Sequence, residues 1–350
     1  MRYTLFGQTG LRVSELALGT GTFGTAWGWG SEPEEARAVF DGFAEAGGTF
    51  LDCSDVYQFG QAEAMLGGLI AADRDHFVLA TKYTAGADPK GGISRTGNSR
   101  KNLVRSVEDS LRRLGTDRID LYWVHFADGH TPVDEIARGF EDLVRAGKVL
   151  YAGFSDFPAW RVARAATLAE LRGWAPVAGI QVEYSLAERT AERELLPMAE
   201  GFGLGVTLWS PLGGGLLTGK QRRGEDGRHT KGGGPVRQEG GRERAILDAV
   251  QAVADEQGAS PAQVAVAWVR GKAAAQPGLV PILGARTRSQ LDDNLGALAV
   301  ALDNTQVARL DQASASPPGF PHEFLGTERF QGMVTGGKWG ELAGAGRVVA

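Results

Sequence analysis

The 350-residue sequence predicts a (β/α)₈ barrel, also called a TIM barrel, with an N-terminal β-hairpin cap and a C-terminal extension. Short apolar runs typical of strands alternate with longer stretches whose apolar residues recur at helical spacing, which indicates parallel strands covered by helices. The number of alternations suits a closed barrel better than an open sheet. The composition agrees, because 43% hydrophobic residues over this length can bury a large core.

The first predicted element is a β-hairpin. The turn Gly7-Gln8-Thr9-Gly10 is rich in glycine, and the apolar residues Tyr3, Leu5, Leu11 and Val13 flank it in alternation. The hairpin precedes the first strand and helix of the repeating pattern. We therefore expect it to cap the bottom of the barrel.

Eight strands and their covering helices follow in alternation. The apolar runs predict strands at 16–19, 49–52, 77–82, 119–125, 149–155, 179–182, 205–209 and 279–283. Helical periodicity predicts helices at 33–46, 62–71, 99–114, 133–146, 159–171, 190–200, 241–256, 261–269 and 287–298. In such a barrel the carboxyl ends of the strands meet at one rim, where active sites lie.

Length, charge and hydropathy restrict the class of protein. We expect a single domain over residues 1–350, because α/β barrels commonly exceed the usual domain length. The net charge of -5 arises from interspersed acidic and basic residues, which offers no basic face for nucleic acid. No signal-peptide pattern and no membrane-spanning apolar run are found. A cytoplasmic protein acting on a small molecule is expected, with no nucleic-acid or membrane partner, and its oligomeric state is left open.

Four residues suited to a proton-coupled reduction lie at or near successive predicted strand ends. Asp52, Lys82 and His125 close the second, third and fourth strands, and Tyr57 follows in the loop after Asp52. A carboxylate beside Lys82, with the ammonium beside the tyrosine hydroxyl, would lower the pKa of Tyr57 from ~10 toward neutrality. Tyr57 could then act as a general acid near neutral pH, while His125 orients the oxygen that accepts the proton.

The later strand ends carry groups of a different kind. Ser155 and Asp156 at the fifth strand, and Gln181 at the sixth, offer donors and acceptors for an amide. Trp209 at the seventh strand offers a flat face for an aromatic ring. Each of these residues alone is compatible with ordinary packing at the rim, but together they suggest a binding site for a nicotinamide ring.

Two further segments suit the phosphates of a dinucleotide. The segment at 210–220 follows Trp209 and reads SPLGGGLLTGK, and its glycines allow backbone amides to approach a pyrophosphate. The eighth strand ends at Gly284-Ala285-Arg286, directly before a predicted helix. An arginine beside helix N-terminal amides can bind an anion, whereas Arg288 on the same turn is expected to be solvated.

The order and flanking residues of Asp52, Tyr57, Lys82 and His125 closely resemble the catalytic tetrad of the aldo-keto reductases. The Ser-Pro-Leu segment after an aromatic residue resembles the cofactor loop of that family, and the resemblance runs from about residue 3 to residue 310. It implies an NADP(H)-dependent oxidoreductase, with NAD(H) less favoured, close to the aryl-alcohol dehydrogenases and the channel β-subunit-like reductases. In the family, the region after the eighth strand holds the adenosine and its 2′-phosphate. The resemblance implies these cofactor-binding residues: Thr20, Gly21, Ser155, Gln181, Trp209, Ser210, Pro211, Leu212, Gly213, Gly214, Lys220, Gly284, Arg286, Gln290, Asp293 and Asn294.

Two positions depart from the family pattern. Asp156 stands where asparagine is common, which removes a donor to a carboxamide oxygen and leaves the role of Asp156 as a ligand open. Gly21 stands where an aromatic residue is often found. This change would widen the pocket unless Trp27 or Trp29 refills it.

Other chemistries find less support in the sequence. The segment at 19–24 matches a G-x-G-x-x-G fingerprint after a strand, but neither a helix pattern nor a suitably placed acidic residue follows it. Cys53, the single cysteine, is expected to serve packing, with a redox role as the less favoured reading. No metal is expected, because the five histidines show no ligand spacing.

Two irregular segments are expected to tune specificity. The segment at about 213–240 is dense in glycine and charge, which predicts a mobile loop that could fold over the cofactor. The tail at about 316–350 contains Phe320, Phe324 and Phe330. We expect its aromatic residues to line the substrate pocket, with burial against a neighbouring subunit as the alternative.

The function predicted from these patterns is hydride transfer between a nicotinamide and the carbonyl carbon of an aldehyde, ketone or sugar, with Tyr57 as general acid and base. A nicotinamide-bound regulatory or redox-sensing subunit with little turnover is the alternative, because such proteins can retain the tetrad. A barrel lyase or isomerase using Tyr57 and Lys82 is a third reading. It leaves Trp209 and Arg286 without a purpose.

Overall fold

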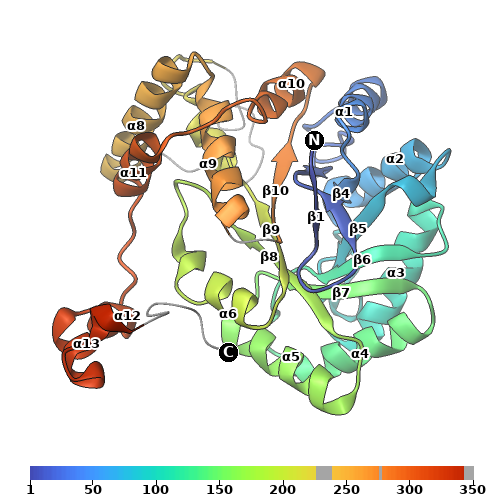
Figure 1. Ribbon diagram of the computed structural model, residues 1–350. Coiled ribbons are helices and arrows are strands. Elements are labelled where there is room, and N and C mark those ends of the chain that lie inside the picture. The colour runs from blue at the N-terminus through green and yellow to red at the C-terminus, as the bar shows by residue number, and fades with distance from the viewer. Residues whose placement is uncertain (226–238, 276–277, 343–350) are drawn as a thin grey trace.

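The protein forms a closed barrel of eight parallel strands, in a computed structural model that describes residues 1–225, 239–275 and 278–342 (Figure 1). Neighbouring strands follow the order β10-β3-β4-β5-β6-β7-β8-β9. Their bounds are Ala17–Gly19 (β3), Phe50–Asp52 (β4), Val78–Tyr83 (β5), Ile119–Val124 (β6), Val149–Ser155 (β7), Val177–Glu183 (β8), Gly205–Trp209 (β9) and Leu279–Gly284 (β10). The predicted fold class is confirmed, and every predicted strand has its counterpart.

Helices surround the barrel, and their apolar faces pack on the outside of the strands. Their bounds are Pro33–Glu45 (α1), Gln61–Ile70 (α2), Arg100–Leu114 (α3), Val133–Arg145 (α4), Ala159–Arg172 (α5), Leu195–Gly201 (α6), Gly241–Gln257 (α8), Pro261–Ala275 (α9), Arg288–Gly296 (α10) and Asn304–Ala313 (α11). Within the described ranges, no helix combines the length and the apolar character needed to cross a membrane.

Two helical segments differ from the prediction. The helix expected at 190–200 is interrupted: a 3₁₀ turn covers Thr190–Glu192, and α6 begins only at Leu195. Pro197 lacks a backbone N–H and would break the interior of a longer helix, but it is tolerated in the first turn of α6. Helix α11 was not predicted, although a capping box between Asp303 and Gln306 marks its start.

The N-terminal hairpin closes the amino-terminal end of the barrel. Strands β1 (Tyr3–Leu5) and β2 (Arg12–Ser14) pair antiparallel, as predicted. The buried ring of Phe6 enters the barrel and makes edge contacts with Phe50 and Trp123, at centroid distances of 5.9 and 6.2 Å. A Cβ atom at Gly205 would lie 2.7 Å from this ring, so glycine is required there. The hairpin therefore fills the bottom of the barrel and leaves the opposite rim open.

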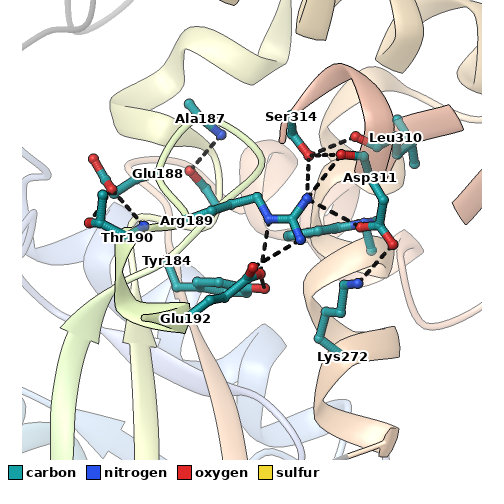
Figure 2. A network of polar contacts seen from close by, with 12 residues as sticks. Tyr184, Ala187, Glu188, Arg189, Thr190, Glu192, Lys272, Leu310, Asp311 and Ser314 are labelled. Carbon is teal, nitrogen blue, oxygen red and sulfur yellow. Dashed lines mark hydrogen bonds and ion pairs between the residues drawn. The ribbon is translucent and has the colours of Figure 1, made fainter. Parts of the chain in front are cut away.

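A polar network around Arg189 ties the end of α11 to the barrel (Figure 2). Arg189 donates to both carboxylate oxygens of Glu192, at 2.9 and 3.0 Å, and to Ser314 Oγ at 3.0 Å. Asp311, one turn earlier, accepts from Lys272 Nζ on α9 at 2.9 Å. The chain is thus fixed at Ser314, just before the C-terminal tail.

Beyond this network the tail projects from the rest of the molecule (Figure 1). It stays joined to the segment before α6, where Arg193 donates to the Pro317 carbonyl at 2.8 Å and Glu194 Oε1 lies 2.9 Å from His322 Nε2. The short helices α12 (His322–Leu325) and α13 (Glu328–Thr335) contact each other through Phe324 and Phe330, and Phe320 is 87% exposed. The prediction that the tail lines the substrate pocket is wrong for residues 316–342, because none of them lines the cavity at the carboxyl ends of the strands. Residues 343–350 lie outside the described ranges, and burial against a neighbouring subunit stays a prediction.

Candidate active site

The carboxyl ends of β4, β5 and β6 bring the predicted tetrad together. Asp52 ends β4, Lys82 lies near the end of β5, and His125 directly follows β6. Lys82 Nζ donates hydrogen bonds to Asp52 Oδ2 at 2.6 Å and to the Cys53 carbonyl at 2.7 Å. Its third bond goes to Tyr57 Oη at 3.3 Å. These three bonds use all the hydrogens of a fully buried ammonium group.

The contacts of Lys82 determine its charge and the direction of the tyrosine hydrogen. Burial opposes the charge of Lys82, but Asp52 and Tyr57 outweigh burial and raise its pKa above the ordinary value of 10.5. The amine therefore stays protonated. Because Lys82 donates to Tyr57 Oη, the hydrogen of the tyrosine must point elsewhere, and Tyr57 is part of the wall of the adjoining cavity.

The expected lowering of the Tyr57 pKa is wrong. Burial raises the pKa of Tyr57 above 10, and the positive charge of Lys82 opposes this effect without overcoming it. The sequence showed the cation but not how strongly the surrounding protein desolvates the hydroxyl. Tyr57 is consequently a neutral donor at neutral pH.

Asp52 is held by residues that were predicted to bind a cofactor. Gln181 Nε2 donates one of its two hydrogens to Asp52 Oδ1 at 2.8 Å, which fixes the orientation of the amide group. The buried Thr20 hydroxyl donates to the Asp52 carbonyl at 3.0 Å. Neither Thr20 nor Gln181 lines the cavity, and both act instead on the tetrad.

His125 is fixed through one of its two ring nitrogens. His125 Nδ1 lies 3.1 Å from Ser54 Oγ, and the ring stands nearly perpendicular to Tyr57 with centroids 6.0 Å apart. Burial, and secondarily the charge of Lys82, lower the pKa of His125 well below 6.5. The imidazole is therefore neutral at neutral pH, with one ring nitrogen as donor and the other as acceptor.

A cavity of about 660 Å³ extends from the tetrad to the start of α10. Its tetrad end contains Gly21, Asp52, Tyr57 and Trp209. The segment after β9 contributes Ser210, Pro211, Leu212, Gly214 and Lys220. The far end contains Gly284, Arg286, Gln290, Asp293 and Asn294. The structure thus brings most of the predicted cofactor residues into one continuous groove.

Trp209 and Asp156 form a pair at the rim. Trp209 Nε1 donates to Asp156 Oδ1 at 3.1 Å, and Asp156 adopts a left-handed backbone with φ of 49°. The Asp156 side chain keeps contact with solvent, but the surrounding protein raises its pKa to about 6, against the effect of the Trp209 bond. Ser155 is fully buried at the end of β7 and does not line the cavity. Of these three residues, only Trp209 faces the groove.

The backbone amides of the glycine segment after β9 were predicted to be free to bind a pyrophosphate, but they are engaged within the segment. Its glycines are needed for the backbone, since Gly214 and Gly215 have φ values of 69° and 100°. The amides of Gly213, Gly214 and Gly215 donate to Ser210 O, Ser210 Oγ and Leu212 O respectively. Gly213 does not line the cavity. The charged side chains beyond the turn, rather than these amides, offer contacts for a phosphate.

The far end of the cavity is built around Arg286. Ser31 Oγ donates to the Arg286 carbonyl at 2.8 Å, and the Arg286 amide donates to Gln290 Oε1 at 2.9 Å. In the described part of the chain, no hydrogen bond or ion pair engages its guanidinium. Arg288, by contrast, is a surface residue as expected: its side chain is 42% exposed, pairs with Asp292 at 2.8 Å and Glu45 at 3.2 Å, and does not line the cavity.

Several cavity residues were not predicted. Arg223 lies three residues after Lys220 and adds a second cation to the same wall. Ser260 begins α9 with reciprocal bonds to Gln263, a capping box that the S-P-A-Q pattern could have revealed. Trp27, by contrast, was a candidate to refill the space at Gly21, and its ring makes an edge contact with Tyr57 at a centroid distance of 6.1 Å.

Comparison with known proteins agrees with this architecture. The aldo/keto reductase family model matches residues 15–315. The uncharacterized oxidoreductase YrpG of Bacillus subtilis is 39% identical over 91% of this chain and 98% of the relative. Norsolorinic acid reductase of Aspergillus flavus is 36% identical over 92% of this chain and 83% of the relative. Aryl-alcohol dehydrogenase GME11368 of Pestalotiopsis microspora is 35% identical over 93% of this chain and 84% of the relative. The chain belongs to the aldo/keto reductase family of oxidoreductases.

Proposed function

We propose that this protein is an NADP(H)-dependent reductase that transfers hydride between the nicotinamide and the carbonyl carbon of an aldehyde, ketone or sugar. The observation that carries the proposal is the third hydrogen bond of Lys82, which reaches Tyr57 Oη at 3.3 Å on the wall of a large cavity. A buried ammonium that donates to a tyrosine oxygen stabilises the phenolate formed when that tyrosine gives up its proton.

The cavity residues fit a nicotinamide dinucleotide. Aldo/keto reductases generally use nicotinamide cofactors, which supply a hydride to the carbonyl carbon when bound. The indole of Trp209 would lie against the nicotinamide ring, and the guanidinium of Arg286, unpaired within the described ranges, would bind the adenosine 2′-phosphate. Added Cβ atoms at Gly215 and Gly284 would meet only open space, so these positions leave room for a ligand.

The side chains of the tetrad carry out the proton transfer. In the reductive direction, Tyr57 donates its hydroxyl hydrogen to the substrate oxygen as negative charge develops there. Lys82 stabilises the resulting phenolate, and Asp52 keeps Lys82 charged and in place. His125, neutral and fixed through Nδ1, positions the carbonyl oxygen with its other ring nitrogen. Water then restores the proton of Tyr57.

Aromatic side chains at the mouth favour an aromatic carbonyl compound among the candidate substrates. Trp27, Trp29, Tyr57 and Trp209 line the cavity, and the ring of Trp27 contacts those of Trp29 and Tyr57. Flat apolar walls favour flat apolar ligands. The name of one relative, an aryl-alcohol dehydrogenase, points to the same class.

A screen for turnover tests the proposal. Aromatic aldehydes and ketones, aliphatic carbonyl compounds and sugars are each incubated with NADPH or NADH, and the absorbance of the reduced nicotinamide is followed. We expect oxidation of NADPH with aromatic carbonyl compounds in preference to the other classes. Tight NADPH binding without turnover on any class would favour the alternative, a nicotinamide-bound regulatory or redox-sensing subunit.

A further inference from the structure

We propose that Ser54 and Asp55 form a hydrogen-bond chain with His125 that sets the tautomer of its imidazole, so that a proton on Asp55 places the ring hydrogen on Nε2, the nitrogen left for the substrate oxygen. Ser54 and Asp55 are therefore positioning residues for carbonyl reduction. The catalytic meaning of this inference rests on the proposed function, whereas the tautomer itself can be measured without turnover.

This hydrogen-bond chain runs from His125 of the tetrad through Ser54 to Asp55 in the protein interior. Ser54 Oγ lies 3.1 Å from His125 Nδ1 and 3.4 Å from Asp55 Oδ1. Ser54 is fully buried and Asp55 is 1% exposed. The second carboxylate oxygen, Asp55 Oδ2, is buried and has no hydrogen-bond partner among the described residues. A buried carboxyl group with an unpartnered oxygen requires an explanation.

The backbone holds these side chains in place. The Asp55 amide donates to the Lys82 carbonyl at 3.1 Å, and the Tyr57 amide donates to the Ser54 carbonyl at 3.1 Å. The loop that supplies Asp52 and Tyr57 to the tetrad thus supplies Ser54 and Asp55 as well. The Nδ1 edge of His125 meets a fixed hydroxyl group and not mobile solvent.

Ser54 has a single hydroxyl hydrogen and two acceptors within reach. An ionised Asp55 is the stronger acceptor and takes that hydrogen, so Ser54 Oγ can only accept from His125, which must then carry its hydrogen on Nδ1. A protonated Asp55 donates to Ser54 Oγ, and the hydroxyl then donates to His125 Nδ1. The ring hydrogen must in that case sit on Nε2, where it can bond to a carbonyl oxygen.

The same chain provides a path for the proton of the buried carboxyl. On ionisation, the O–H bond of Asp55 breaks as one forms at Ser54 Oγ, the former Ser54 hydrogen moves to Nδ1, and the Nε2 hydrogen leaves to water. One proton is lost overall, and the imidazole stays neutral throughout. Reprotonation reverses each step.

The surroundings of Asp55 bring its pKa, and with it the change of the His125 tautomer, into the physiological pH range. Burial raises the pKa of Asp55 to about 7, the charge of Glu63 on α2 acts in the same direction, and Arg113 on α3 opposes both. Glu63 forms an ion pair with Arg113 at 2.6 Å and accepts from Thr81 Oγ1 at 2.6 Å, so it is engaged elsewhere. Tyr122 on β6 also faces this group and stays neutral, because burial raises its pKa well above 10.

Nitrogen NMR of the protein labelled with ¹⁵N-histidine tests the inference. Long-range ¹H–¹⁵N spectra distinguish the two neutral tautomers, and His125→Gln identifies the His125 signals. Spectra are recorded from about pH 5.5 to about pH 8.5, on either side of the Asp55 pKa of about 7. We expect the Nε2–H form at the acidic end and the Nδ1–H form at the basic end, with a midpoint near pH 7.

Two variants and a control make the test specific. Asp55→Asn should keep one tautomer over the whole range, and Ser54→Ala should abolish the pH-dependent change even if Asp55→Asn does not fold. Cys53→Ala, a buried change at the neighbouring residue outside the chain, should titrate like the wild type. A wild-type tautomer that does not change with pH, or an unaltered midpoint in Ser54→Ala or Asp55→Asn, would overturn the proposal. The absence of any substrate for the protein would affect only the proposed function.

Discussion

Arg286 provides the sharpest test of cofactor choice, because its guanidinium is unpaired within the described ranges while its backbone is fixed. Ser31 Oγ holds the Arg286 carbonyl, and Gln290 Oε1 accepts from the Arg286 amide. Arg286→Ala therefore removes a cation from the cavity and leaves the turn that carries it intact. The competing explanation, in which Arg286 pairs with an aspartate of α10, is not supported: Asp292 bonds Arg288, and Asp293 bonds Ser260 and Gln263.

The expected size of the effect follows from the bonds that a guanidinium makes to a phosphate. Such a group can donate two charge-assisted hydrogen bonds, each contributing roughly 1.5–3 kcal/mol. Arg286 is half-buried, so solvent and salt reduce the gain toward the lower end. Arg286→Ala should weaken NADPH binding by about tenfold or more and change NADH binding little, because NADH lacks the 2′-phosphate.

Quenching of tryptophan fluorescence gives the dissociation constants, because Trp209 lines the same cavity. NADPH and NADH are each titrated into the wild type, Arg286→Ala and Arg288→Ala. Arg288 is the matched control, since it lies on the same turn and is already paired with Asp292 and Glu45. Equal losses of affinity for both nucleotides in Arg286→Ala, or an equal effect in Arg288→Ala, would refute the assignment.

Three further predictions concern the buried groups around the tetrad. Tyr57→Phe should lower turnover by a factor on the order of 10²–10⁴ while leaving the NADPH dissociation constant almost unchanged, and near-normal reduction by this variant would contradict its role as the acid. Lys82→Met and Asp52→Asn should together cost less than the sum of their separate effects on kcat/KM, because Asp52 acts through Lys82, whereas strict additivity would mean independent roles. The pKa of Asp55 rises from its ordinary 3.8 to about 7 on folding, so the unfolded protein releases this proton at a lower pH than the folded protein does. The wild type should therefore lose stability as the pH rises from about 4 to about 7, by at most ~4 kcal/mol. Asp55→Asn should remove this loss. Thermal unfolding of wild type and variant at pH 5 and pH 8 measures this difference, and an identical pH dependence in the two proteins would rule it out.

The fold and the position of the tetrad could be predicted because both depend on local sequence patterns. Apolar runs fix where the strands lie, and parallel strands in a barrel end at one rim. Asp52, Lys82 and His125 each stand at or beside such an end, so their proximity follows from the topology without knowledge of side-chain conformation.

The remaining features depend on contacts between distant segments, which local patterns do not encode. The link between Ser54 and His125 spans 71 positions and requires two side chains to meet within 3.1 Å. The partners of the glycine amides depend on the folding of the segment back onto Ser210. The path of the tail depends on packing between α12 and α13, whereas the prediction that it covers the pocket rested on its aromatic content and on the family resemblance. Residues 226–238, the centre of the predicted mobile loop, lie outside the described ranges.

The sign of the Tyr57 pKa shift bears on the direction of the proposed reaction. A raised pKa keeps Tyr57 protonated throughout the physiological range, as a proton donor in carbonyl reduction requires. Oxidation of an alcohol needs the phenolate at the start, so its rate should rise with pH as Tyr57 ionises. Lys82 stabilises the phenolate form of Tyr57, because its hydrogen bond to Tyr57 Oη strengthens when that oxygen becomes charged. Burial of Tyr57 therefore favours the reactant state of reduction, while Lys82 lowers the cost of reaching its product state.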